Sequence, residues 1–99
     1  MIGLTTVRII GPSMEPVLRN GETYLAFTGV RVRDGDVIVI RHPQRPEMLS
    51  VKRVKRRDGD GWWVEGDNPK ESTDSRHFGV VGPDNVIARV VVRLRPLRR

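Results

Sequence analysis

The chain has 99 residues, a formal net charge of +6 and no cysteine. Its length fits one small domain over residues 1–99 with a modest core. Hydrophobic residues make up 37% of the chain and charged residues 30%, a balance typical of a soluble globular protein and not of a disordered or membrane-spanning one. No aromatic residues alternate with the basic ones to stack on bases, so the positive charge is interpreted as a solvated surface and no nucleic-acid partner is expected.

Short β-branched runs alternate with Gly, Pro, Asp and Asn in the first half of the chain, which predicts strands joined by turns. The expected strands cover residues 7–10, 23–27 and 37–41. Gly11-Pro12 ends the first of them, and His42-Pro43 ends the third. Between the first two strands, residues 15–20 are expected to form one helical turn. Asp34-Gly35-Asp36 is expected to be a tight turn.

The second half of the chain is expected to contain one hairpin, one long loop and a closing strand. The hairpin strands, residues 49–57 and 62–65, flank the turn Asp58-Gly59-Asp60-Gly61. Residues 68–79 are expected to form the polar loop, and residues 86–94 the last strand. Many short strands and little helix predict a mostly-β fold, a small coiled β-barrel.

Ser13 lies in the segment Gly11-Pro12-Ser13-Met14-Glu15-Pro16, where a glycine and two prolines place it at a sharp, rigid bend. A nucleophile needs such a place because its hydroxyl must project from a fixed backbone into free space. Backbone N–H groups at such a bend can also converge on an oxyanion. Ser13 is therefore a candidate nucleophile, although the segment alone fits an ordinary serine in a proline-rich turn better.

A serine nucleophile needs a base, and the chain has two histidines. His42 precedes Pro43 at a strand end with no obvious acidic partner, and His77 lies in the polar loop, so both are interpreted as surface residues. Neither histidine has the spacing of a metal-dependent hydrolase, and the chain lacks cysteine. We therefore expect no metal and no cofactor.

A lysine can replace histidine as the base if its pKa falls towards neutrality, which burial achieves by disfavouring the ammonium form. In a strand, the face of Lys52 is shared by Met48, Ser50 and Val54 and is largely apolar. Lys55 points to the opposite face. The alternation therefore favours Lys52 as the base, although a basic residue in a basic run is also an ordinary feature.

The polar segment from Gly66 to Arg76 is dense in residues that bond to backbone and to one another. Ser72 is short enough to hold a lysine amine in place, and Asp74 and Arg76 can form a fixed ion pair. Such a loop can support a site from behind. Taken alone, it fits a plain polar loop.

Taken together and in order, these segments resemble the signal peptidase I family of serine–lysine peptidases. The resemblance rests on GPSMEP at 11–16, RDGDVIV at 33–39, VKRV at 51–54, GDN at 66–68 followed by Ser72, Asp74, Ser75 and Arg76, and GVV at 79–81. It implies a mostly-β fold like that of signal peptidases and LexA-type proteins. It also implies a serine endopeptidase acting on a protein or peptide substrate.

The resemblance assigns roles to particular residues. Ser13 falls on the nucleophile and Lys52 on the general base. The other assigned residues are Ser72, which orients the lysine amine, Asp74 and Arg76, which form a supporting pair, and Met14, which lies near the substrate groove. Two departures stand out. Gly11 occupies a position where many members carry a serine whose hydroxyl binds the oxyanion, so the oxyanion would depend on the backbone of Ser13 and Gly11. Ala88-Arg89 replaces a usual glycine–arginine, which concerns the fold more than the chemistry.

Within that family, the likeness is greatest to the small nickel-type superoxide dismutase maturation proteases. It rests on overall length and on RHP at 41–43, GWWV at 61–64 and GDNP at 66–69. It implies that the substrate is the precursor of nickel superoxide dismutase, whose N-terminal propeptide is removed. No apolar run reaches the ~20 residues of a membrane helix, and the chain start lacks the features of a secretory signal. We therefore expect a cytoplasmic protein.

Two alternatives remain open from the sequence. The chain could be the catalytic domain of a membrane-anchored signal peptidase I whose anchor lies elsewhere in the gene. It could also be a non-enzymatic or self-cleaving regulatory module, because self-cleaving repressors share a Gly-x-Ser-Met serine and a later lysine. The sequence gives no oligomeric state.

Overall fold

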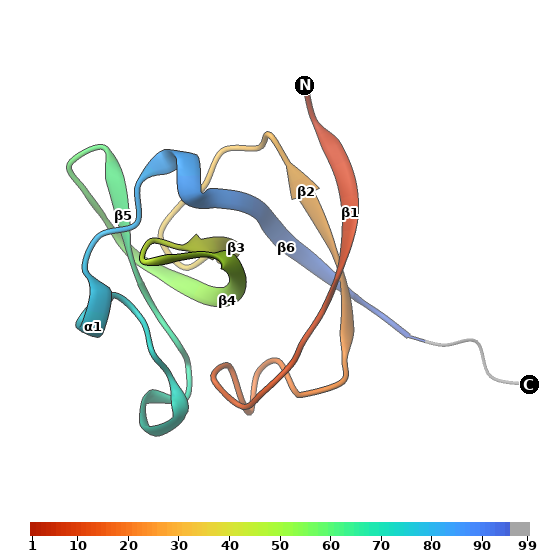
Figure 1. Cartoon of the computed structure of the whole chain (residues 1–99). Helices are drawn as coiled ribbons and strands as arrows, with labels where there is room; N and C mark the ends of the chain where they lie inside the picture. Colours follow the sequence, from red (N-terminus) through yellow and green to blue (C-terminus); the bar gives the residue numbers. More distant parts are fainter. Residues whose placement is uncertain (96–99) are drawn as a thin grey trace, which may run out of the picture.

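The computed structural model of the chain describes residues 1–95 and contains one six-stranded antiparallel sheet (Figure 1). The strands follow the order β1-β2-β6-β3-β4-β5 across the sheet. Their bounds are β1 Gly3–Arg8, β2 Thr23–Thr28, β3 Val37–His42, β4 Arg45–Asp58, β5 Gly61–Glu65 and β6 Val86–Leu94. Three short helical segments follow β5: η1 Pro69–Glu71, α1 Ser75–Phe78 and η2 Pro83–Asn85. The mostly-β expectation is confirmed.

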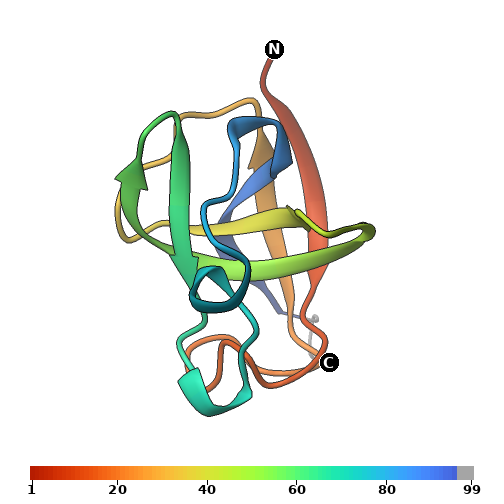
Figure 2. The same cartoon turned by 60° about the vertical axis from the view of Figure 1, so that its left-hand side comes forward.

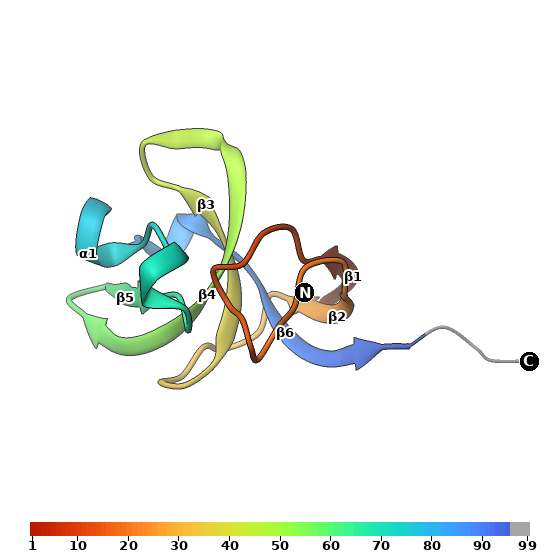
Figure 3. The ribbon, with the colours of Figure 1, turned by 90° about the horizontal axis from the view of Figure 1, so that it is seen from below.

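The sheet is strongly coiled, so that β1 and β2 lie to one side of β6 and the β3–β4–β5 group to the other (Figures 1 and 3). Irregular pairing contributes to this shape, because the register shifts in four of the five strand pairs. The buried apolar residues of the described chain form three clusters, one of which has no member from β1 or β2. The buried core consists of Ile9, Met14, Leu18, Ala26, Ile38, Val39, Ile40, Val54, Val64, Val81 and Ala88.

Four strands match their expected positions closely, namely β2, β3, β5 and β6. The turns at Asp34-Gly35 and Gly59-Asp60 also lie where the sequence places them. The first strand begins earlier than expected, at Gly3, because Gly3–Arg8 pairs along its full length with Thr23–Thr28. The fourth strand is longer than expected and extends back to Arg45.

Two expected segments differ from the structure. Residues 15–20 form turns and no helix, although Leu18 N–H donates to the Met14 carbonyl at 3.0 Å. Pro16 has no N–H to give a helix, and the preceding carbonyls bond to another segment, as described below. Residues 68–79 are not a plain loop either, because η1 and α1 form within them. Asp74 caps α1 by accepting from Arg76 N–H.

Ala88 suits its position in the sheet. It is 3% exposed and packs with Ala26 and Val39 in the core. Within residues 1–95, no helix combines the length and the apolar character needed to cross a membrane.

Candidate active site

Ser13 lies in the turn between β1 and β2, which is anchored at both ends. At its start, Gly11 has φ of +91°, a conformation that glycine adopts without strain, and its N–H donates to Asn20 Oδ1 at 2.9 Å. Further along, Glu15 N–H donates to the Pro12 carbonyl at 3.1 Å. These bonds fix the backbone that carries the Ser13 side chain. Ser13 is only half-buried, so its hydroxyl remains accessible.

Lys52 lies on β4, where it pairs with Ile38 of β3. Its neighbours on the same face include fully buried Val54, and Lys52 itself is only 4% exposed. Burial lowers the pKa of Lys52, and the negative charge of Asp74 opposes that shift in part. The expected burial of this lysine is confirmed, whereas Lys55 is exposed at the irregular pairing between β4 and β5.

The two residues meet across the fold. Lys52 Nζ donates to Ser13 Oγ at 3.0 Å, although they lie 39 positions apart in the chain. A neutral amine at the same place would accept the serine proton along the same line. This contact is the geometry that a serine nucleophile and a lysine base require.

Asp74 is the centre of the supporting cluster and is fully buried. Its carboxylate accepts hydrogen bonds from Gly66 N–H at 2.9 Å, from the Ser72 hydroxyl at 2.7 Å and from Arg76, whose Nε and Nη2 donate at 2.9 and 2.7 Å. Burial alone would raise the pKa of Asp74. The Arg76 guanidinium and the other donors outweigh it and hold that pKa well below its usual range.

Ser72 differs in its contacts from the role that the resemblance gave it. Its hydroxyl donates to Asp74, and in the described part of the chain Lys52 Nζ donates to Ser13 and not to Ser72. The carboxylate is the stronger acceptor, which is why the serine proton points to it. Ser72 therefore belongs to the hydrogen-bonded cluster around Asp74, and in the described residues it makes no hydrogen bond to the Lys52 amine.

The segment Gly66–Asn68 connects this cluster to the serine turn, and the sequence did not reveal how. Asn68 Nδ2 donates to the Pro12 carbonyl at 3.0 Å, and Asn68 N–H donates to the Ser13 carbonyl at 2.9 Å. A Cβ on Gly66 would lie 2.6 Å from the Ser13 carbonyl oxygen, so only glycine fits there. The two segments lie together at the lower end of Figure 2.

Asp67 ties the same segment to the strand that carries the lysine. Its carboxylate pairs with Arg53, whose Nε and Nη2 donate to it at 2.8 Å each. Its N–H donates to Met14 Sδ at 3.4 Å. Asp67 thus bonds to the residue after Ser13 and to the residue after Lys52. Arg53 looked like an ordinary surface residue in the sequence, because nothing in the alternation of β4 indicates its partner 14 positions away.

A groove of about 540 Å³ runs in front of the two residues, and its wall is largely apolar. One side comes from β1 and the segment after it, and the other from residues 48–52 of β4. In the described chain, the outer edge of β1 has no strand partner, and β4 pairs with β5 only from Arg53 onwards. The groove therefore lies between two free strand edges. Its lining residues are Thr6, Val7, Arg8, Ile9, Ile10, Ser13, Met14, Val39, Met48, Leu49, Ser50, Val51 and Lys52.

The backbone donors expected for an oxyanion differ from each other. Gly11 N–H is already bonded to Asn20, so in this conformation it is not available, contrary to the expectation. Ser13 N–H has no acceptor among residues 1–95. Met14, expected near the groove, does line it, yet it is 1% exposed and its side chain belongs mainly to the core.

The histidines hold turns of the backbone. His42 Nδ1 accepts from the N–H groups of Gln44 and Arg45 at 3.0 and 3.1 Å. His77 Nδ1 accepts from Asp74 N–H at 3.3 Å at the start of α1. In the part of the chain that the structure describes, neither is bonded to Ser13.

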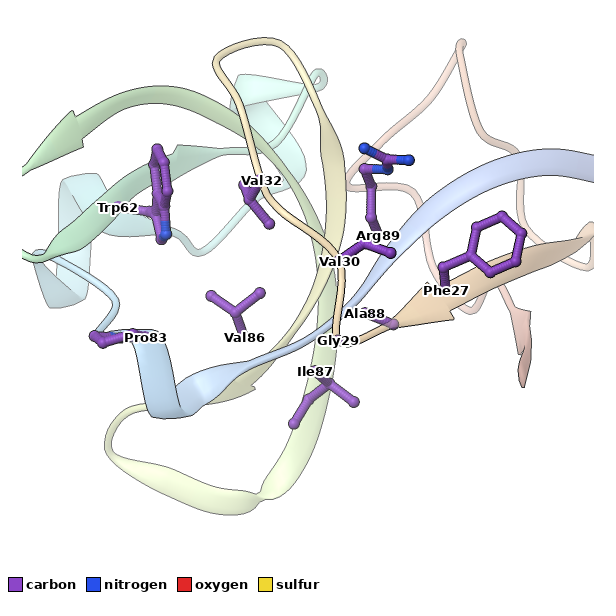
Figure 4. Close-up of a pocket in the computed structure, with 10 residues that line it drawn as sticks. All are labelled: Phe27, Gly29, Val30, Val32, Trp62, Pro83, Val86, Ile87, Ala88 and Arg89. Atoms are coloured by element: carbon purple, nitrogen blue, oxygen red, sulfur yellow. The ribbon is translucent and has the colours of Figure 1, made fainter. Parts of the chain in front are cut away.

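A second cavity, of about 220 Å³, lies on another side of the molecule, between the β2–β3 connection, β5 and the start of β6. Figure 4 shows its side chains, among them Trp62, Val32 and Val86, arranged around one space. Neither Ser13 nor Lys52 lines it. It is therefore separate from the groove described above.

Comparison with known proteins places this arrangement in a family. The Peptidase S24-like family matches residues 3–91, a range that contains all the site residues described above. The chain belongs to this family. The expectation of a peptidase family, drawn from the serine, lysine and loop segments in their order, is confirmed at that level.

The chain is also similar in sequence to individual mitochondrial proteins, among them three protease subunits. Mitochondrial inner membrane protease subunit 1 of Xenopus tropicalis is 33% identical, over 88% of this chain and 66% of the relative. Mitochondrial ATP-independent inner membrane protease subunit 1a of Arabidopsis thaliana is 29% identical, over 94% and 71%. Mitochondrial inner membrane protease subunit 2 of Schizosaccharomyces pombe is 29% identical, over 99% and 66%. The chain thus spans about two thirds of the length of these relatives. Their names mention no nickel superoxide dismutase.

Proposed function

We propose that this chain is a serine endopeptidase in which Ser13 is the nucleophile and Lys52 the general base. The observation that carries the proposal is the 3.0 Å contact between Lys52 Nζ and Ser13 Oγ at the wall of an open groove. Membership of the Peptidase S24-like family supports it. No other lysine or histidine is bonded to Ser13 within residues 1–95.

The environment of Lys52 suits a base. The amine is buried and its pKa is lowered, so a larger share of the lysine is neutral near physiological pH than in an exposed lysine. The nearby Asp74 charge limits this effect. Asp74 is itself neutralised by Arg76, with its carboxylate oxygen 2.7 Å from Nη2. The cluster therefore fixes the loop behind the dyad with little net charge of its own.

The reaction follows from these positions. Neutral Lys52 takes the proton from Ser13 Oγ as the oxygen attacks the scissile carbonyl carbon, and the carbonyl oxygen becomes an oxyanion that Ser13 N–H stabilises. Lys52 then gives its proton to the leaving amine as the C–N bond breaks. A water molecule loses a proton to Lys52 and attacks the acyl-enzyme, and Ser13 leaves with its proton restored.

The substrate would lie extended in the groove. β1 and residues 49–52 of β4 both line the groove, and each has one edge without a strand partner in residues 1–95, with which a peptide strand can pair. The apolar lining then favours small or apolar side chains next to the scissile bond. Backbone pairing gives affinity, and the lining gives selectivity.

For the specific substrate, we propose the precursor of nickel superoxide dismutase, cleaved in the cytoplasm to remove its N-terminal propeptide. This proposal is supported by the resemblance of the RHP, GWWV and GDNP segments to the nickel-type maturation proteases. The alternative is a membrane-anchored signal peptidase, which the names of the mitochondrial relatives favour.

The test is incubation of the purified chain with the nickel superoxide dismutase precursor, followed by mass analysis of the new N-terminus. Wild type should produce one defined cleavage, and Ser13→Ala and Lys52→Ala none. Lys55→Ala is the matched control, because Lys55 is an exposed lysine on the same strand, and it should cleave like wild type. Cleavage by Ser13→Ala would overturn the dyad. Cleavage only of precursors of exported proteins would favour the signal peptidase. No cleavage, with salt-dependent DNA binding, would favour a regulatory module.

A further inference from the structure

We propose that Asn68 is a positioning residue that aims the Ser13 N–H at the oxyanion. The inference rests on the proposed function, because an oxyanion forms only if Ser13 attacks a carbonyl. It concerns a side chain that is hydrogen-bonded to neither Ser13 Oγ nor Lys52 Nζ in the described structure. Asn68 acts through the peptide group that joins Pro12 to Ser13.

The contact that carries the inference is the bond from Asn68 Nδ2 to the Pro12 carbonyl at 3.0 Å. The Pro12–Ser13 peptide is trans, since no cis bond other than Glu15–Pro16 is found in residues 1–95. In a trans peptide the carbonyl oxygen and the following N–H point in opposite directions within one plane. A donor that fixes the Pro12 carbonyl therefore also fixes the direction of Ser13 N–H, away from Asn68.

The rest of the turn cannot do this alone. Glu15 N–H also donates to the Pro12 carbonyl, at 3.1 Å, but this bond lies within the turn and would rotate with it. The bond from Gly11 N–H to Asn20 likewise stays within the connection between β1 and β2. Asn68 instead joins the turn to a segment that Asp74 and Arg53 hold in place. Its own N–H bond to the Ser13 carbonyl, at 2.9 Å, keeps the two segments together when its side chain is changed.

The free state of Ser13 N–H agrees with this role. Gly11 N–H is occupied by Asn20, whereas Ser13 N–H, like the following Met14 N–H, has no acceptor in residues 1–95. The stabilisation that Ser13 N–H can give to an oxyanion depends on the direction in which it points. Removal of an oxyanion donor costs about 10²–10³ in kcat in other enzymes, and a misplacement of about 1 Å costs about 10².

The experiment compares Asn68→Ala and Asn68→Asp with wild type. Both variants lose the Nδ2 donor and keep the backbone bond. Asn85→Asp is the matched control, because Asn85 lies outside the site, at the end of η2. Rates are measured on a quenched fluorescent peptide spanning the precursor cleavage site, over a pH range that reaches the alkaline plateau. The plateau matters because a carboxylate at position 68 would also shift the Lys52 pKa, and that effect disappears once Lys52 is neutral.

We expect kcat on the plateau to fall about tenfold to a hundredfold in both Asn68 variants, with KM changed by less than about twofold. A second readout is independent of activity. The residual dipolar coupling of the Ser13 N–H bond reports its direction, and it should change in both Asn68 variants while couplings in β2 and β6 stay the same. Asn85→Asp should change neither readout.

An unchanged Ser13 coupling in folded Asn68→Ala overturns the inference, whether or not the chain cleaves the peptide. An altered coupling with an unchanged plateau kcat overturns it as well. A fall in kcat only below the plateau would mean that the substitution acts through the Lys52 pKa and not through the direction of Ser13 N–H. That result also overturns the inference. If wild type cleaves nothing, the proposed function fails, and the coupling still decides whether Asn68 orients this peptide group.

Discussion

Lys52 Nζ lies 3.0 Å from Ser13 Oγ because a sheet strand and a turn from opposite parts of the chain are joined by a third segment. Lys52 is held by its pairing with Ile38, and Ser13 by the bonds of its turn to Asn68. The Gly66–Asn68 segment contacts the neighbours of both residues. The contact between Ser13 and Lys52 is therefore a product of the whole fold and not of one motif.

Lys52→Met should abolish cleavage while leaving the chain folded. The methionine has a similar length and no amine, so Ser13 loses its base, and the rate should fall by at least about 10⁴-fold. Lys52 is 4% exposed, and a buried amine carries a desolvation cost that methionine lacks. The free energy of unfolding should therefore stay within about 1 kcal/mol of wild type or rise. Peptide cleavage and urea unfolding check both expectations. Cleavage at the wild-type rate would exclude Lys52 as the base.

The pH dependence of cleavage should follow the depressed pKa of Lys52. Below that pKa the lysine is protonated, so kcat/KM should rise about tenfold per pH unit and then level off. The midpoint should lie below the ordinary lysine pKa of about 10.4, because burial disfavours the ammonium form. A rate profile measured at constant ionic strength gives the midpoint. A midpoint at or above the ordinary value would contradict the proposed role of burial.

The same shift has a consequence for stability, with a definite sign. Between the lowered folded pKa and the ordinary unfolded pKa of Lys52, the unfolded chain binds more protons than the folded chain. Stability should therefore rise with pH across that window, relative to Lys52→Met, and stay constant below it. Paired urea unfolding curves of the two proteins at several alkaline pH values measure this difference. A difference that stays constant across the window would show that the Lys52 pKa is not depressed by folding.

The sequence predicts the strands well because their signals are local. Alternation and turn residues place β3 and β6, and the apolar face of β4 indicates that Lys52 is buried. The contacts that build the site are not local. Nothing in the chain order shows that Asn68 reaches Pro12, 56 positions away, or that Asn20 occupies Gly11 N–H. Such contacts depend on how the sheet coils and on which distant segments it brings together. Local patterns such as alternation and turn residues do not reveal this.

Asp74→Asn should destabilise the chain strongly at neutral pH. The amide keeps the shape of the side chain but loses the charge that pairs with Arg76, and its NH₂ group faces donors such as Gly66 N–H and the Ser72 hydroxyl. Arg76 is partly exposed, so we expect a loss of about 2–4 kcal/mol, less than for a fully buried pair. Urea unfolding at pH 7 measures it. Asp34→Asn, at an exposed turn position, should have little effect.

Acid should remove the difference between wild type and Asp74→Asn. The folded pKa of Asp74 is lowered, so its stabilising contribution is fully present above the unfolded carboxyl pKa of about 3.9 and declines as pH falls towards the folded value. The two unfolding curves should therefore approach each other below about pH 4. A gap that stays constant down to pH 2 would mean that the carboxylate charge does not contribute.

Gly66→Ala should damage both the fold and the site. The added Cβ would lie 2.6 Å from the Ser13 carbonyl oxygen and from Ser72 Cβ, so the loop or the serine turn must move. We expect a loss of stability of about 1–3 kcal/mol and a fall in kcat of about a hundredfold, because a displacement of about 1 Å at the reacting group is enough for that. Thermal unfolding and peptide cleavage measure the two effects.

Gly82→Ala is the matched control for this substitution. Gly82 has φ of −69°, and a Cβ there meets nothing within 4 Å, so alanine fits its backbone without a clash. It should leave kcat unchanged and keep or slightly raise stability, by up to about 1 kcal/mol, because alanine reduces the freedom of the unfolded chain. If Gly66→Ala behaved like Gly82→Ala, the close approach of residue 66 to Ser13 would not be a requirement of the site.

If Gly66→Ala unfolds the chain, kcat is compared between wild type and Ser72→Ala instead. That variant removes a hydroxyl that donates to Asp74 at 2.7 Å and adds no atom, and it should loosen the same loop with a smaller loss of rate.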